Sequence, residues 1–596
     1  MGTDGPGGAA GLGVRLIARV VPAVPTFAVD DGFRYAVPER LAAKIGLGSM
    51  VRVPLGGRRV GGFVVDVDDG DPTGLKPIAS ISGSAPVFDQ ATLEVMRWAA
   101  GYYVAPLSVM LGRCAPPNVP RKSSRPSVGE PGEASHPLVD VILRHAHRTT
   151  VWLDAQPAHS WIGPVGRALR REGKSLLVVV PTGEEVQRIA SGLGEEGVIA
   201  VDHEMNDAEV TDAWSVAAHR GGVVVGTPRV AMWPVSGLGA VAAVEESRRA
   251  MKDRQTPTVH ARELLLRRAA TSVVPALFGG PAPSLELVAR APELLRGAGR
   301  IWPLVEVVDR REEPPGGGLL TDRAKQALRA CVRAGGRAFV FAHRRGYSAA
   351  SRCVKCRTLR TCPGCGSRPD PQPDCRRCGA ALGPCASCGG GRFEPLGAGV
   401  GRLVDEIRRF ETGVGEYPSE DSIQVGTERD LTTLESRDLV VMVDMDGLMF
   451  GVDYRATEEA FRIGTRLASK VARGSGRRLL VQTSDPEHRV IASLRRGDPG
   501  AFHAAELEVR RGLGYPPFSS IVLIEIRDGD TAGFDAQVRT LIGAAEVMGP
   551  APSRHGTRWL IQGQDLTQTK RQLRAVVQRA RDSGATVRID VDPIEL

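Results

Sequence analysis

The sequence predicts a multidomain α/β protein whose largest part is a pair of parallel-sheet lobes. Three observations lead to this prediction. The chain has 596 residues, long enough for about three to five domains. Short continuous apolar runs alternate with helical segments over most of its length, as in parallel strands that are covered on both faces. A polar stretch rich in Pro, Gly and Ser at 121–137 separates these runs from an N-terminal region of different texture.

The N-terminal region is expected to be a small β domain behind a flexible tail. Residues 1–14 lack the charged and apolar regions of a signal peptide and are typical of a mobile terminus. Residues 15–66 alternate apolar and polar residues in short runs broken by Pro and Gly, which predicts strands. A helical stretch around Leu93–Tyr103 follows. One domain is therefore expected over 15–120, with the linker at 121–137 after it.

The first lobe is expected over 138–302 and the second over 303–346 and 395–500. Apolar runs predict the strands of both lobes. In the first lobe they lie at 175–181, 221–227 and 238–244, and in the second at 337–343, 422–427, 438–444 and 478–483. A cysteine-rich module at 347–394 interrupts the second lobe. The remainder, 501–596, has a strand, helix and strand texture that predicts a small α+β domain.

Eight of the ten cysteines stand in four CxxC pairs: Cys353/Cys356, Cys362/Cys365, Cys375/Cys378 and Cys385/Cys388. Eight thiolates are enough for two closed tetrahedral zinc sites, so the spacing predicts two Zn²⁺ per chain. Such ions are structural, because thiolates fill every position and leave none for water. A reduced or disulfide-bonded loop is the alternative that this spacing disfavours. The spacing leaves open whether adjacent, alternating or nested pairs share an ion.

The composition is that of an ordinary soluble globular protein, with 42% hydrophobic and 24% charged residues. A net charge of +9 suits a phosphate-rich partner such as nucleic acid, although a merely basic protein fits nearly as well. No run of 18 apolar residues occurs, so no membrane span is expected. Thiol pairs without an export signal predict a cytoplasmic location.

A nucleotide site is difficult to find in either lobe. The segment Ala168–Ser175 ends in Gly-Lys-Ser like a phosphate-binding loop, but it follows a helix and precedes a strand, the reverse of the order required. It is predicted to be the C-terminal turn of a helix. The segment in the correct place, Asp154–Trp161, contains neither Gly nor Lys. Glu245 and Glu246 follow a predicted strand, where we expect them in a solvated turn.

Several longer motifs point to one family. The CxxC pairs follow FVFAHRRGYSA, and the chain continues with VDMDGLMFGVDYRATEEAFRIGTRLASKVARG, QTSDPEH at 482–488 and RRGLGYPPF at 510–518. FRYAVPERL, VRVPLGGRRVGGFVV and WAAGYYVAPLSVML occur near the N-terminus. Together they resemble the PriA family of primosomal replication-restart proteins, which are superfamily 2 DNA helicases. The resemblance covers nearly the whole chain and implies an N-terminal 3′-DNA-end-binding domain and two RecA-like lobes.

The chain departs from the family where ATP chemistry should be. DAQPAHSW replaces the phosphate loop GxTGSGKT, and VEES at 244–247 replaces DEEH. In the last helicase motif, Arg466 to Arg473, only the second arginine stands. Loss of an arginine finger alone can slow such hydrolysis about 10³-fold or more. The departures together imply a lobe pair without selected ATP hydrolysis, and ATP is not expected as a cofactor.

Site residues follow from the resemblance alone. The family's end-binding pocket corresponds to Phe33, Arg34, Gly56 and Lys76, where Phe33 would contact the terminal base or sugar and Lys76 a phosphate. Arg34 replaces an acid of the family. The competing interpretation makes Phe33 an ordinary core residue. The resemblance also implies nested zinc ligation, with Cys353, Cys356, Cys385 and Cys388 at one ion and Cys362, Cys365, Cys375 and Cys378 at the other.

The expected function is that of a replication restart protein that binds stalled or abandoned forks and helps to reload the replicative helicase, without ATPase activity. The implied partners are forked or branched DNA, primosome and helicase-loading proteins, and as one further candidate a single-stranded DNA-binding protein; no membrane is implied. One alternative is an active ATP-dependent 3′→5′ DNA helicase, and another is a zinc-dependent protein-interaction scaffold.

The family's winged helix has no room at 121–137, and its aromatic-rich loop becomes MKDRQ at 251–255, with Met251 in place of the aromatic.

Overall fold

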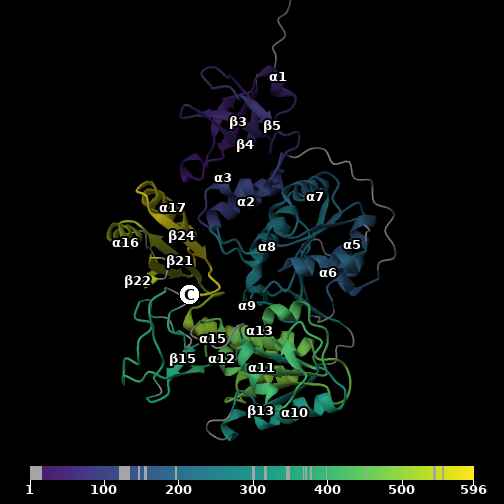
Figure 1. Cartoon of the computed structure of the whole chain (residues 1–596). Helices are drawn as coiled ribbons and strands as arrows, with labels where there is room; N and C mark the ends of the chain where they lie inside the picture. The colour runs from purple at the N-terminus through teal and green to yellow at the C-terminus, as the bar shows by residue number, and fades with distance from the viewer. Residues whose placement is uncertain are drawn as a thin grey trace, which may run out of the picture.

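The protein was analysed as a computed structural model. It describes residues 16–119, 135–144, 148–153, 157–194, 197–297, 302–313, 318–343, 350–356, 358–364, 366, 368–369, 372–375, 379–396, 399–451, 453–540, 545–553 and 556–596. Figure 1 shows an N-terminal domain at the top, two α/β lobes below it and a C-terminal domain at their side. The expected tail, residues 1–14, and most of the expected linker lie outside the described residues.

The N-terminal domain is built on a five-stranded antiparallel sheet in the order β2-β1-β4-β3-β5. Its elements are β1 (Leu16–Pro22), β2 (Phe33–Ala36), α1 (Glu39–Ala42), β3 (Met50–Leu55), β4 (Arg58–Asp69), β5 (Ser80–Ser82), α2 (Gln90–Tyr102) and α3 (Leu107–Cys114). Strand β3 alternates buried and exposed residues over Val51–Val53, as expected, whereas β1 is buried from Ile17 to Pro22 except at Arg19. Helix α2 packs against α8 of the first lobe and α17 of the C-terminal domain.

The first lobe (lobe 1, 137–297) holds a seven-stranded parallel sheet in the order β12-β6-β11-β10-β7-β9-β8. Its elements are α4 (Pro137–Arg144), β6 (Thr149–Leu153), α5 (His159–Arg171), β7 (Ser175–Val179), α6 (Gly183–Leu193), β8 (Val198–Val201), α7 (Asp207–His219), β9 (Val223–Gly226), β10 (Leu238–Val244), α8 (Ala261–Ser272), β11 (Ala276–Gly279), α9 (Leu285–Val288) and β12 (Glu293–Arg296). Strand β7 is buried along its whole length. Val178 faces one hydrophobic cluster and Val179 the other, which explains the continuous apolar run.

The second lobe (lobe 2, 302–513) holds a six-stranded parallel sheet in the order β13-β20-β19-β14-β18-β17. Its elements are β13 (Leu304–Asp309), α10 (Asp322–Arg333), β14 (Ala338–Phe341), β15 (Ala350–Cys353), β16 (Phe393–Leu396), α11 (Val400–Arg408), β17 (Val414–Glu416), β18 (Ile423–Gly426), the 3₁₀ turn η5 (Glu428–Thr432), β19 (Leu439–Met442), α12 (Asp446–Met449), α13 (Ala456–Ser469), β20 (Arg478–Thr483), α14 (Arg489–Arg496) and α15 (Pro499–Leu513). The cysteine-rich module leaves the lobe through β15 and returns through β16, which pair antiparallel.

The C-terminal domain is a four-stranded antiparallel sheet in the order β22-β23-β21-β24. Its elements are β21 (Ser520–Arg527), α16 (Thr531–Thr540), β22 (Glu546–Ser553), β23 (Gly556–Gly563), α17 (Thr567–Asp582) and β24 (Thr586–Val591). The predicted α/β organisation is therefore confirmed, with a β domain first and an α+β domain last. Two boundaries differ. Pro137, placed at the end of the linker, begins α4, because Pro is favourable at the first helical position. Helix α15 packs with lobe 2 through Phe502, although residues from 501 onwards were expected in the C-terminal domain.

The N-terminal and C-terminal domains are joined to lobe 1 in a different way from lobe 2. One hydrophobic cluster runs without interruption through the N-terminal domain, lobe 1 and the C-terminal domain. Lobe 2 has two clusters of its own, to which Ala282 is the only contribution from the described residues of lobe 1. No helix among the described residues has the length and hydropathy required to cross a bilayer.

Candidate metal centre, DNA-binding surface and nucleotide site

Four cysteine sulfurs meet at the base of the inserted module. The ligand atoms of Cys353, Cys356, Cys385 and Cys388 all lie within 4.8 Å of one another. The Sγ atoms of Cys353 and Cys388 are 3.5 Å apart, as are those of Cys356 and Cys385. A tetrahedral ion with Zn–S bonds of about 2.3 Å would hold its sulfurs about 3.7 Å apart. The cluster therefore has the donor type and spacing that a structural zinc ion requires, and it is the first of the two nested sets implied by the resemblance.

The turns of the CxxC pairs have the same backbone design. In the last pair, Gly389 donates its N–H to the Cys385 carbonyl (2.8 Å) and adopts a φ of +67°. Gly366 and Gly379 make the equivalent bonds to the carbonyls of Cys362 (2.9 Å) and Cys375 (2.7 Å). Glycine suits this left-handed position because it has no Cβ. Three of the four CxxC pairs are therefore followed by the same glycine turn.

The second set is only partly described. Cys362 and Cys375 are buried and share a small cluster with Leu382. Cys365 and Cys378 lie outside the described residues, so the second ion remains a prediction. At the first centre, hydrogen bonds to Thr358 lower the pKa of Cys356 to about 6, which favours the thiolate that a metal ion needs.

The four DNA-contact candidates lie on adjoining segments of the N-terminal domain. Phe33 and Arg34 begin β2, Gly56 lies in the turn between β3 and β4, and Lys76 precedes the short bridge from Pro77 to Ala36. The Ala36 N–H donates to the Lys76 carbonyl (3.0 Å), which ties the loop of Lys76 to β2.

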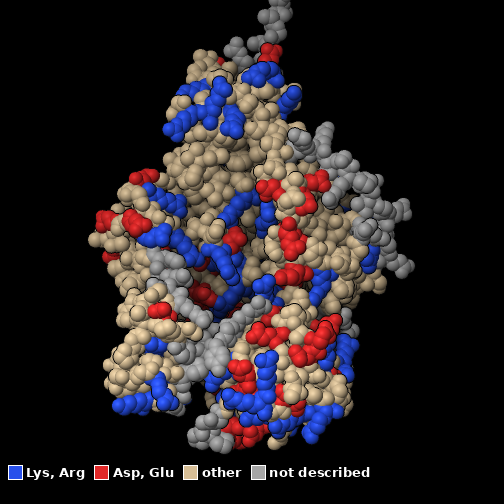
Figure 2. Space-filling model, in the orientation of Figure 1, with Lys and Arg blue, Asp and Glu red and all other residues tan. Residues whose placement is uncertain are grey.

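The side chains at these positions are available to a ligand. Phe33 is 41% exposed, so the interpretation that it is a core residue is wrong. Gly56 has a φ of +53° and open space where a Cβ would stand, which leaves room for close approach. Figure 2 shows Lys and Arg gathered over this domain. The exposed basic residues of the domain include Arg19, Arg34, Arg40, Arg52, Arg58, Arg59 and Lys76.

The expected position of a nucleotide lies at the carboxyl edge of the lobe 1 sheet. Ligands of such sheets bind outside the carboxyl ends of the strands, at the N-terminus of the following helix. Residues 154–156 lie outside the described part, but Trp161 in the first turn of α5 is buried. Its indole lies so close to Gly279 that a Cβ there would be 2.6 Å from Cζ2. A phosphate loop would instead place a Ser or Thr hydroxyl for magnesium at this point.

The Gly-Lys-Ser string is confirmed as a helix C-terminal turn. Helix α5 ends at Arg171, Gly173 takes a φ of +68°, and β7 begins at Ser175. The Ser175 hydroxyl donates to the Ser236 carbonyl (2.6 Å) and accepts from the Gly222 N–H (2.9 Å). The Ser175 hydroxyl joins segments next to strand ends. It lies at the edge of the sheet opposite to the edge where a ligand would bind.

The expectation of a solvated turn at Glu245 and Glu246 is wrong. Glu246 is 2% exposed, and Arg262 (3.1 Å) together with both the N–H and hydroxyl of Ser284 satisfies its carboxylate. Glu245 has a φ of +46° and contacts Arg248 (3.1 Å) and Arg466 of lobe 2 (3.1 Å). Burial raises the pKa of Glu246, whereas the arginines around Glu245 outweigh the effect of burial and lower its pKa. These partners are remote in sequence, so the local pattern carried no sign of them.

The first two residues of the MKDRQ segment, Met251 and Lys252, are also buried. Met251 has no exposed surface, and Lys252 is 6% exposed. The Lys252 ammonium contacts Asp590 Oδ1 (2.5 Å) and donates to the carbonyls of Val591 (2.8 Å) and Asp592 (2.7 Å) of the C-terminal domain. Neither side chain can stack on a base in this arrangement. The segment instead joins lobe 1 to the C-terminal domain.

Two family models match segments near the two ends of the chain. Residues 19–116 match the PriA family described as 3′DNA-binding domain (3′BD), and residues 511–594 match the Primosomal protein N C-terminal domain. The replication restart protein PriA of Treponema pallidum is 24% identical over 95% of this chain and 98% of its own length. The Bacillus subtilis PriA is 26% identical over 61% of this chain, and the chain spans about half (51%) of that relative. The probable PriA of Mycobacterium leprae is 28% identical over 68% of this chain and 69% of its own length.

Among solved structures, the DUF1998 helicase MrfA aligns with a TM-score of 0.32 and 12% identity over 60% of this chain and 49% of its own, a likeness too low to support an argument. The fold and the family matches define the class: a two-lobe α/β protein with a DNA-binding domain of the 3′BD type at its N-terminus. Within this class the chain is similar to the PriA family in both of its end domains and, at 24% identity over 95% of its length, to the Treponema pallidum protein.

Proposed function

We propose that this protein is a replication restart protein that recognises branched DNA without hydrolysing ATP. Its N-terminal domain would hold a DNA end at Phe33, Arg34, Gly56 and Lys76, and the lobes with their zinc module would present a surface to helicase-loading partners. A single-stranded DNA-binding protein is one further candidate partner. The observation that carries the proposal is the combination of an open, basic DNA-binding domain with a nucleotide position occupied by protein side chains.

The occupied nucleotide position supports the absence of ATP chemistry in two ways. The Glu245 carboxylate is already neutralised by Arg248 and Arg466, so it is not free to hold a magnesium ion. Trp161 is buried at the start of α5, where phosphates would need an open helix N-terminus.

An ATPase and unwinding assay with forked DNA tests this part of the proposal. We expect no DNA-stimulated release of phosphate and no strand separation, with wild-type protein and with Lys174→Gln giving the same background. Lys174 is the lysine of the Gly-Lys-Ser string and is exposed. If DNA-stimulated turnover occurs and Glu245→Gln abolishes it, the protein is an active helicase, the second candidate function.

A binding assay tests the DNA part. Fluorescence anisotropy at near-physiological salt should show tighter binding to a fork with a free leading-strand 3′ end than to a duplex of equal length. The salt concentration is kept the same for both substrates, because phosphate contacts make the affinity strongly salt-dependent. Equal affinity for both substrates would favour the third candidate, a zinc protein that serves only as an interaction scaffold.

A further inference from the structure

The boundary between the two lobes is made of charged side chains. Lobe 2 shares almost no hydrophobic cluster with lobe 1 among the described residues, Ala282 excepted. Elements at the boundary instead supply arginines and glutamates: α6 and the end of β10 from lobe 1, and η5 and α13 from lobe 2. Lobes that are joined in this way depend on ion pairs for their relative placement.

The first group of ion pairs lies at the expected nucleotide position. Arg466 of α13 contacts Glu245 of lobe 1 (3.1 Å) and Glu428 of η5 (2.9 Å). Arg248 of lobe 1 contacts Glu185 (2.5 Å) and reaches the Thr432 hydroxyl of lobe 2 at 3.5 Å. The Arg248 and Arg466 side chains are only 7% and 5% exposed, so salt in the solvent screens these contacts little.

The charges in this group are complementary across the boundary. Lobe 1 supplies two glutamates and one arginine, Glu185, Glu245 and Arg248, a sum of −1. Lobe 2 supplies Arg462, Arg466 and Lys470 against Glu428 and Glu459, a sum of +1. Arg249 of lobe 1 also contacts Glu459 of lobe 2 (3.3 Å), so charged side chains of each lobe face partners of opposite sign in the other.

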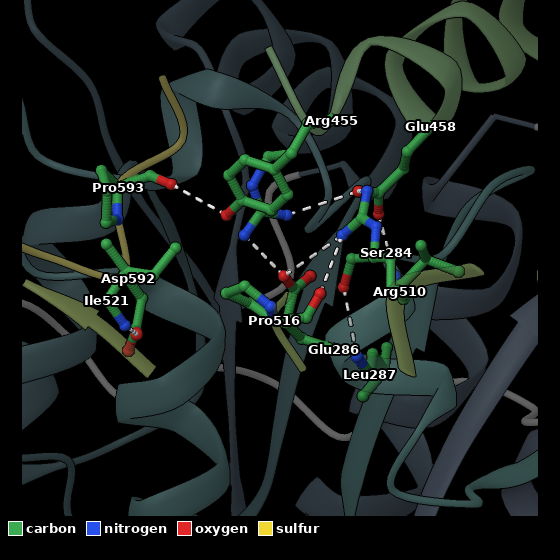
Figure 3. A network of polar contacts seen from close by, with 12 residues as sticks. Ser284, Glu286, Leu287, Arg455, Glu458, Arg510, Pro516, Ile521, Asp592 and Pro593 are labelled. Atoms are coloured by element: carbon green, nitrogen blue, oxygen red, sulfur yellow. Dashed lines mark hydrogen bonds and ion pairs between the residues drawn. The ribbon is translucent and has the colours of Figure 1, made fainter. Parts of the chain in front are cut away.

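The second group, shown in Figure 3, lies at the N-terminal end of α13, where Arg455 is the N-cap residue and Glu458 is in the first turn. Arg455 of lobe 2 contacts Glu286 of lobe 1 (2.5 Å), and the Leu285 N–H of lobe 1 donates to Glu458 of lobe 2 (2.9 Å). Arg510, 1% exposed, pairs with Glu458 (2.8 Å) and lies 4.0 Å from Glu286. The contacts border a cavity of about 470 Å³ between the lobes and the C-terminal domain.

We propose that these two groups act as a permanent clasp that fixes the lobes in one closed arrangement, so that the lobe pair is a rigid platform instead of a nucleotide-operated hinge. Opening the boundary would separate Glu245 from Arg466 and Glu286 from Arg455 together, because both arginines project from the same helical region of lobe 2. A nucleotide would have to displace the Glu245–Arg466 pair to enter. The clasp does not rest on the proposed function, since fork binding by the N-terminal domain is possible with open or closed lobes.

A distance measurement between the lobes tests the clasp. Spin labels are attached through a non-natural keto amino acid at Glu172, at the end of α5, and at Gln326 in α10, which are both exposed. This chemistry leaves the cysteines and the zinc sites intact. Double electron–electron resonance on the full-length zinc protein should give one narrow distance distribution. Addition of Mg-ATP, a non-hydrolysable analogue or forked DNA should leave it unchanged.

The variant Arg466→Met/Arg455→Met removes one cross-boundary partner from each group. We expect a second, longer distance population in this variant and no change in Arg495→Met, an exposed arginine of α14 in the same lobe. A folded double variant with an unchanged narrow distribution would overturn the clasp, as would a wild-type distribution that is broad or that shifts with nucleotide. If the double variant does not fold, the wild-type response to nucleotide decides the matter alone. A failure here leaves the fork-binding and ATPase results of the proposed function untouched.

Discussion

Lys252 of lobe 1 and Asp590 of the C-terminal domain form a buried ion pair, with 2.5 Å between Nζ and Oδ1. The lysine side chain is 4% exposed, and burial lowers its pKa although Asp590 favours the charged form. The pair lies beside the continuous hydrophobic cluster that joins the N-terminal domain, lobe 1 and the C-terminal domain. It is one of several polar contacts in a junction that also has a large apolar part.

Lys252→Met is expected to destabilise this junction. The substitution leaves the Asp590 carboxylate with Thr258 (2.8 Å) as its remaining partner from lobe 1, and removal of one member of a buried pair costs about 3–5 kcal/mol. Thermal unfolding followed by circular dichroism should show a lower midpoint. Lys174→Gln, at an exposed site in the same lobe, should leave the midpoint unchanged. A midpoint of Lys252→Met equal to that of the wild type would show that the pair contributes nothing.

Phe33→Ala is expected to weaken binding of a DNA 3′ end. Base stacking on an aromatic ring contributes about 1–3 kcal/mol, so the loss should be roughly 5- to 150-fold in affinity. Anisotropy with a recessed 3′ end measures it. Leu304→Ala is a matched control, because Leu304 is an exposed apolar residue (63%) of lobe 2. Equal losses in both variants would contradict a specific role for Phe33.

Cys385→Ser is expected to remove one zinc ion from a chain that otherwise binds two. The residue belongs to the described sulfur cluster and is buried, so its loss breaks a closed site. Mass spectrometry of the metal content after dialysis gives the stoichiometry. Cys331→Ser, an isolated thiol of α10, should retain full zinc. Full zinc in Cys385→Ser would mean that the cluster is not a metal site.

We expect His503 to make the free energy of unfolding depend on pH between about 4 and 6.5. Burial lowers the pKa of His503 to about 4, even though Glu458, the Pro283 carbonyl and Asp498 favour the charged form. An unfolded histidine titrates near 6.5, so in this interval the unfolded state binds the proton and the folded state does not. Stability should therefore fall as the pH drops from about 6.5 to about 4, by up to roughly 3 kcal/mol, and be unaffected above 6.5.

Chemical denaturation of His503→Gln across this interval measures the effect. The variant should show a weaker loss of stability towards pH 4 than the wild type does. His203→Gln, at an exposed position of lobe 1, should follow the wild-type curve. If His503→Gln keeps the full pH dependence, other groups are responsible for it.

Local patterns predicted most of the fold because strands and helices here match their own sequences. The runs at 238–244 and 478–483 coincide with β10 and β20, since strands covered on both faces favour continuous apolar residues, which fill β10 and the Leu479–Val481 part of β20. The turn at Gly173–Ser175 was predictable for a similar reason: the order of helix and strand around it excludes a phosphate loop.

The candidate sites depended on contacts that no local pattern contains. The CxxC spacing predicts thiolate sites, but only the pairing of β15 with β16 brings Cys353 and Cys356 to Cys385 and Cys388. A glutamate after a strand, such as Glu245, is expected in a solvated turn as long as a distant partner such as Arg466 is not known.

The sequence by itself determined the fold class, the four CxxC pairs that predict zinc sites and the lack of Gly and Lys in Asp154–Trp161. These follow from residue type and from spacings of a few positions, which constrain the chain locally. Only the tertiary structure decided that Glu245 pairs with Arg466, 221 positions later in the chain, and that Phe33 is exposed. The physical reason is that the free energy of a charge or a ring depends on its surroundings, which folding assembles from distant segments.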